Sequence, residues 1–101
     1  MYRIESISKE RWLFLSCDSS FDEPEGFVAL LKQYQHQLGG KIVSVSQDYQ
    51  YAIEGDPLHL VFQWDRCFGI TIVVPTNIDL STAKKHVDML CEQLNSKKRA
   101  N

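Results

Sequence analysis

The chain has 101 residues, which suits one domain with one hydrophobic core, and its 44% hydrophobic and 24% charged residues match an ordinary globular protein. The formal net charge of −2 disfavours nucleic acid as a partner, because general polyanion binders carry a marked excess of basic residues. No apolar run approaches the roughly 20 residues of a membrane-spanning helix, so no membrane partner is expected.

Two short strands are predicted at residues 2–7 and 11–16, joined by a turn at residues 8–10. The second strand carries large apolar side chains on both faces, because Trp12 and Phe14 alternate with leucines. Such a strand is typical of the interior of a sheet, or of a position that is buried on both sides.

A first helix is predicted from Asp22 to Leu38, because apolar residues recur there every three or four positions. Asp22 and Glu25 have the spacing of a capping box at the start of this helix. Gly39 and Gly40 follow its end, where glycine takes up the left-handed backbone conformation at little cost.

Four further strands are predicted within residues 41–74, because large apolar residues alternate there with small or polar ones. The predicted loops are three or four residues long and contain Gly, Pro, Asp or Ser, as in antiparallel hairpins. One register places the large side chains on a single inward face. The residues expected there, together with the helix residues that cover them, are Val43, Val45, Tyr51, Leu58, Leu60, Phe62, Ile70, Ile72, Leu30, Leu31, Val87 and Leu90.

A second helix is predicted from Thr76 to Asn95, directly after Pro75, with Thr76 or Asp79 as its N-cap. Residues 96–101 are expected to form a basic disordered tail.

The predicted elements follow one another as β-β-α-β-β-β-β-α within a single domain at residues 1–95. This order predicts an α+β fold, a two-layer sandwich with a mostly antiparallel sheet and both helices on one face. The place of the first two strands stays open, since they can flank residues 41–45 or lie at the other edge of the sheet.

The three cysteines, Cys17, Cys67 and Cys91, have neither Cys-x-x-Cys spacing nor a histidine at ligand spacing. We therefore expect free thiols, no disulfide and no structural metal, as is usual in the reducing cytoplasm. Cys67 follows Arg66, whose charge can lower a thiol pKa, but nucleophilic chemistry also needs an oriented base and the sequence offers none.

An acidic stretch at residues 17–25 offers oxygen ligands for calcium, but an EF-hand loop needs Gly at its sixth position and Glu at its twelfth. Glu23 and Ala29 occupy those positions, so we interpret the carboxylates as favourable charges at the start of the first helix. The sequence thus predicts no catalytic residue and no cofactor.

The outer face of the predicted sheet is the candidate binding surface. In the predicted register one row holds Ile42, Ala52, His59 and Val73, and the next holds Ser44, Gln50, Val61 and Thr71. These side chains carry few charges, whereas a face that meets only water is commonly rich in charged residues. We expect binding at Ile42, Ala52, His59, Val61 and Val73, with an ordinary exposed sheet face as the alternative.

His59 occupies the middle of this expected surface, between Ala52 and Val73. Burial against a partner would favour the neutral imidazole over the charged form. Association through this face is therefore expected to weaken toward mildly acid pH.

Three segments carry a resemblance to a known family: Tyr-Arg-Ile-Glu at residues 2–5, Asp-Glu-Pro-Glu-Gly-Phe at 22–27 and Leu-Val-Phe-Gln-Trp-Asp at 60–65. With these segments the chain resembles a family of short uncharacterised proteobacterial proteins that share a domain of unknown function. The resemblance implies a cytoplasmic bacterial protein. It implies no activity, so no functional residue is carried over.

We expect a non-enzymatic module that binds another protein or forms a homodimer, through the outer sheet face or an edge strand. The alternative is a small-molecule binder or enzyme with a site between the helices and the sheet. The residues expected at that alternative site are Trp12, Tyr49, Tyr51, Trp64 and Cys67. A nucleic-acid role rests only on the basic run at residues 97–99.

Overall fold

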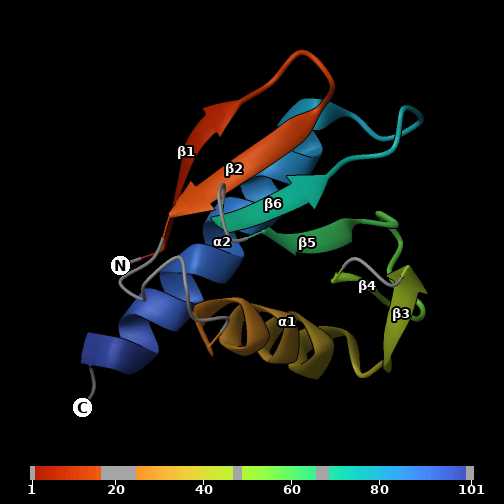
Figure 1. Cartoon of the computed structure of the whole chain (residues 1–101). Coiled ribbons are helices and arrows are strands. Elements are labelled where there is room, and N and C mark those ends of the chain that lie inside the picture. The colour runs from red at the N-terminus through yellow and green to blue at the C-terminus, as the bar shows by residue number, and fades with distance from the viewer. Residues whose placement is uncertain (1, 17–24, 47–48, 66–68, 100–101) are drawn as a thin grey trace.

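The computed structural model describes residues 2–16, 25–46, 49–65 and 69–99, and Figure 1 shows their arrangement. The described elements follow the predicted order, and all strand pairs are antiparallel, which confirms the α+β class. The elements are β1 (Arg3–Ile7), β2 (Trp12–Ser16), α1 (Glu25–Leu38), β3 (Ile42–Ser46), β4 (Gln50–Ile53), β5 (Val61–Asp65), β6 (Gly69–Val73) and α2 (Leu80–Arg99).

The sheet has the strand order β1-β2-β6-β5-β4-β3, so the first hairpin lies at the edge opposite β3. β2 pairs with β6, with Leu13 opposite Ile72. This position inside the sheet is one of those predicted for a strand that is apolar on both faces. β1 and β3 form the two edges.

One face of the sheet, called here the inner face, packs against both helices. Leu13, Phe62 and Ile72 lie side by side on this face, and each is 0% exposed. α2 contacts the β1 side and α1 contacts β3 and β4, and Figure 1 shows α2 running behind β2 and β6. The inward prediction for Leu60 and Ile70 is confirmed, because these side chains are only 1% and 3% exposed.

The predicted inward placement of Val43 and Val45 is wrong, because these side chains are 38% and 52% exposed. β3 is out of phase with the prediction by one residue: Ile42 lies opposite Ile53 and packs against the core. The pairing also shifts between Ser44 and Ser46, which inserts an extra residue into β3. In the observed phase Ile42 joins Ile53 on the inner face, and a shift of one residue would turn Ile42 to the opposite face.

Leu58 and Leu60 are buried, as predicted, but they lie in a loop and not in a strand, since β5 begins at Val61. Asp56 organises this loop and is itself only 2% exposed. Its Oδ1 accepts hydrogen bonds from the Tyr34 hydroxyl at 2.7 Å and from the Leu58 N–H at 2.9 Å. Its Oδ2 accepts a third from the Leu60 N–H at 2.9 Å, so one carboxyl group connects the loop to α1.

The described end of α1 follows the prediction. Gly39 has a φ of +72°, and its N–H donates to the Gln35 carbonyl at 2.8 Å, which closes the last turn. Gly40 passes so close to β4 that a Cβ there would collide with the Glu54 carbonyl oxygen. The predicted helix start at Asp22 lies outside the described residues.

α2 begins after Asp79, whose Oδ2 accepts from the Thr82 N–H at 3.2 Å, so Asp79 and not Thr76 is the N-cap. The predicted helix end at Asn95 needs correction, because residues 96–99 continue the helix. Lys and Arg are good helix formers, so the basic composition of this segment does not oppose the extension. Among the described residues, neither helix combines the length and apolar character needed to span a membrane.

Replacement of Asp56 by alanine tests the role of this carboxyl group. The change leaves the Tyr34 hydroxyl and two loop N–H groups without their buried acceptor. We expect the free energy of unfolding in urea to fall by about 3 kcal/mol or more, because each buried unpaired group costs about 1–3 kcal/mol. Asp88→Ala, at an exposed ion pair with Lys84, is the control and should cost under about 1 kcal/mol. Equal losses in both variants would contradict this role for Asp56.

The hydroxyl of Tyr34 gives a second, pH-dependent prediction. Burial, and then the hydrogen bond to Asp56, raises the pKa of Tyr34 above its ordinary value of 10.0. Because the folded chain holds this proton more tightly, the stabilisation is complete below the unfolded pKa and is lost as the pH rises above about 10. The stability advantage of the wild type over Tyr34→Phe should therefore shrink above pH 10 in chemical denaturation. Tyr49→Phe, at a 55% exposed side chain, is the control; a constant advantage of the wild type over Tyr34→Phe would refute the prediction.

Candidate functional site

An apolar row crosses the outer face of the sheet from β2 to β3. Trp12 lies opposite Val73, and Val73 lies opposite Val61. β4 and β3 come after β5 in the strand order, and on them Ala52 lies opposite Val43. Each of these residues alternates with inward neighbours and therefore points to the outer face. We call these five residues the outer stripe.

The outer stripe is accessible although it is apolar. Trp12 is 40% exposed and Val43 is 38% exposed, while Ala52, Val61 and Val73 are partly buried by their neighbours. Both helices cover the inner face, and no described element packs on the stripe. The stripe is thus the part of the described sheet where apolar side chains meet solvent on several adjacent strands.

The neighbouring row on the same face is uncharged and, apart from Phe14, polar. It consists of Phe14, Thr71, Gln63 and Gln50, in register across four strands. Gln50 Nε2 donates to Gln63 Oε1 at 3.1 Å, so part of the hydrogen-bonding capacity of these amides is met within the face. A partner that covers these two rows would bury no ionised side chain, which removes the largest desolvation cost.

Trp12 is held in place by its neighbour on the same strand. The rings of Trp12 and Phe14 meet edge to face, with centroids 6.2 Å apart and an angle of 63° between their planes. Such a contact restricts the indole before any partner arrives. Trp12 therefore presents a large, ordered apolar surface at one end of the outer stripe.

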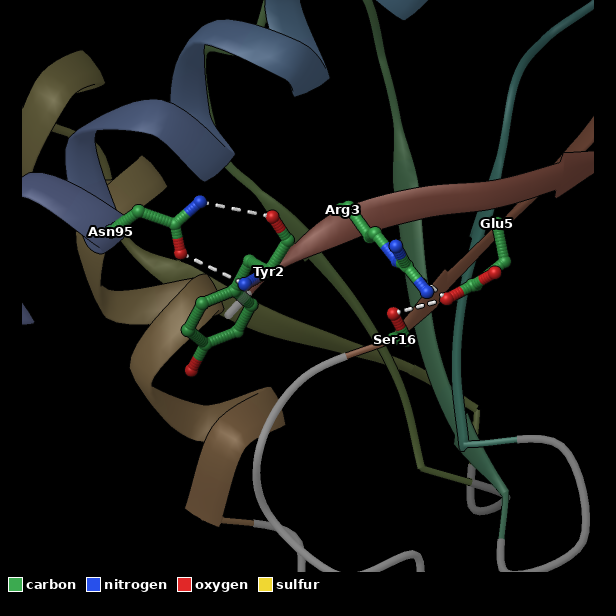
Figure 2. A network of polar contacts seen from close by, with 5 residues as sticks. All are labelled: Tyr2, Arg3, Glu5, Ser16 and Asn95. Carbon is green, nitrogen blue, oxygen red and sulfur yellow. Dashed lines mark hydrogen bonds and ion pairs between the residues drawn. The ribbon is translucent and has the colours of Figure 1, made fainter.

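Charged side chains lie at two borders of this face. Asp65 lies on it at the end of β5, where it pairs with Gly69, and a group of charges that are paired with one another lies at the β1 border (Figure 2). Arg3 Nε donates to Glu5 Oε1 at 2.8 Å, and Ser16 Oγ donates to the same oxygen at 2.6 Å. The hydrogen bond from Ser16, followed by that from Arg3, lowers the pKa of Glu5. This cluster marks the boundary of the uncharged surface.

Both edge strands are poorly suited to pair with another strand. The pairing of β1 shifts between Ile4 and Ser6, and that of β3 shifts between Ser44 and Ser46. A bulge interrupts the regular row of backbone groups that a pairing strand would need, and natural sheets use bulges to protect their edges. Asn95 in addition ties the N-terminal end of β1 to α2, since its amide accepts from the Tyr2 N–H at 2.8 Å and donates to the Tyr2 carbonyl at 3.0 Å (Figure 2).

The structure separates the residues that the sequence placed together in the candidate surface. Ala52, Val61 and Val73 lie on the outer face. Ile42 does not, because it packs against the core on the inner face. His59 lies outside any strand, in the loop before β5, with a φ of +51°.

These placements correct two sequence-based expectations. His59 is not between Ala52 and Val73, so the expected weakening of association at acid pH has no basis in this residue. Trp12 and Val43 belong to the outer stripe but were not predicted there. The sequence did contain an indication for Trp12. The strand is apolar on both faces, and when the helices cover one face, the other face with Trp12 is left for another partner.

The residues of the alternative, small-molecule site are also divided between the two faces. Tyr49 and Trp64 make an edge-to-face contact with centroids 5.6 Å apart, and Tyr51 packs against Phe27 at 6.0 Å. Trp12 lies on the opposite face of the sheet from this aromatic group. Cys67 and the acidic residues 17–24 lie outside the described residues.

Cys91 is a free, buried thiol on α2. Burial raises the pKa of Cys91 to about 11, and the negative charges of Asp88 and Glu92 act in the same direction. The thiol is therefore protonated at neutral pH and is a poor nucleophile. Within the described part of the chain, no three His, Cys, Asp or Glu residues are grouped as a metal site requires.

Comparisons with known proteins identify no relative that would suggest a function. The chain matches no protein family model, no curated protein and no solved structure. The resemblance to short proteobacterial proteins of unknown function therefore stays a prediction.

The exposure of Val43 gives a stability prediction for the outer stripe. We expect Val43→Ala to change the free energy of unfolding by no more than about 0.5 kcal/mol, as is usual at a surface position. Val87→Ala is the matched control, because Val87 is 1% exposed and its truncation leaves a cavity that costs about 2 kcal/mol. Urea denaturation measures both values. A loss at Val43 as large as that at Val87 would show that Val43 supports the fold and is not free to bind.

Proposed function

We propose that this protein is a non-enzymatic interaction module that binds a protein surface through the outer stripe. The observation that carries the proposal is the run of five apolar side chains across five adjacent strands on the face opposite both helices. Contiguous apolar surface of this kind, bordered by polar residues, marks interaction sites in soluble proteins.

The composition of the outer stripe supports a protein partner. Trp12 is of the residue type most enriched among interface hot spots, and its contact with Phe14 orders it in advance. The valines and Ala52 give a flat surface with little side-chain entropy to lose on binding. The uncharged amides of Gln50 and Gln63 beside the stripe are suited to a polar rim.

We place the module in the cytoplasm of a bacterium as part of the same proposal. The free thiol of Cys91 fits a reducing compartment, and the resemblance noted above supports a bacterial source. Neither a catalytic group nor a cofactor is part of the proposal, because the outer stripe works through apolar contact and exclusion of water.

Site-specific photo-crosslinking in living cells tests the proposed function. A photoreactive amino acid replaces Val43 in the outer stripe or, as a matched control, Val28 on α1, since these valines are 38% and 40% exposed. We expect a discrete covalent adduct from position 43 and none of that mass from position 28. The adduct should disappear when Trp12→Asp is added at the other end of the outer stripe.

Two results would contradict the proposed function. Position 43 could yield no adduct above the background, or positions 43 and 28 could yield the same adducts. Either result would mean that the outer face meets only water or makes unspecific contacts.

A further inference from the structure

We draw no further inference here: the strongest candidate, the apolar outer stripe that crosses β2, β6, β5, β4 and β3 on the face opposite both helices, belongs to the site already described, and nothing in the structure shows what covers it.

Discussion

The rest of the structure depends on the hydrogen bonds that the buried carboxylate of Asp56 accepts. This carboxylate accepts hydrogen bonds from the Tyr34 hydroxyl on α1 and from the N–H groups of Leu58 and Leu60 in the loop before β5. The Tyr34 ring packs in turn against Phe62 of β5, with centroids 5.4 Å apart. A fully satisfied polar network in a low-dielectric core specifies one arrangement, because any other leaves a buried polar group unpaired. Asp56 thus fixes where α1 lies relative to β5 and, through Leu58 and Leu60, how the core closes.

The placement of α1 has a consequence for the opposite side of the sheet. The described part of the chain contains two helices, and both lie on the inner face, where α1 covers the β3–β4 side and α2 the β1 side. Arg11 holds the segment between β6 and α2 in place, since its guanidinium donates to the carbonyl oxygens of Val74, Pro75 and Ile78. No described helix is left for the outer face, so its apolar residues remain at the surface. An exposed apolar row is therefore a result of the layer architecture and not of a local irregularity.

The same architecture explains why the outer face, and not an edge, is the surface to consider for binding. The edge strands carry bulges next to Ile4 and Ser44, which disturb the backbone row that an added strand would use. The centre of the outer face is regular, uncharged and ordered by the contact of Trp12 with Phe14. Sequence periodicity could reveal that strands near Val61 and Val73 have an outer face, but it could not reveal which neighbours they have. Strand order decides which side chains become adjacent, and strand order is a tertiary property.

The sequence by itself determined the elements and most of the core, because hydrophobic periodicity is a local property and because residues such as Leu60 and Ile70 are too apolar to leave in water. Only the tertiary structure decided which side chains of β3 face inward. The alternation of Val and Ser is compatible with either choice, and the pairing of Ile42 with Ile53 selects one of them. The tertiary structure also decided that His59 lies in a loop, because the hydrogen bonds that Asp56 accepts from the Leu58 and Leu60 N–H groups hold this segment outside the strand. Long-range pairing and buried hydrogen bonds depend on residues far apart in the chain, and a pattern read along one segment does not contain them.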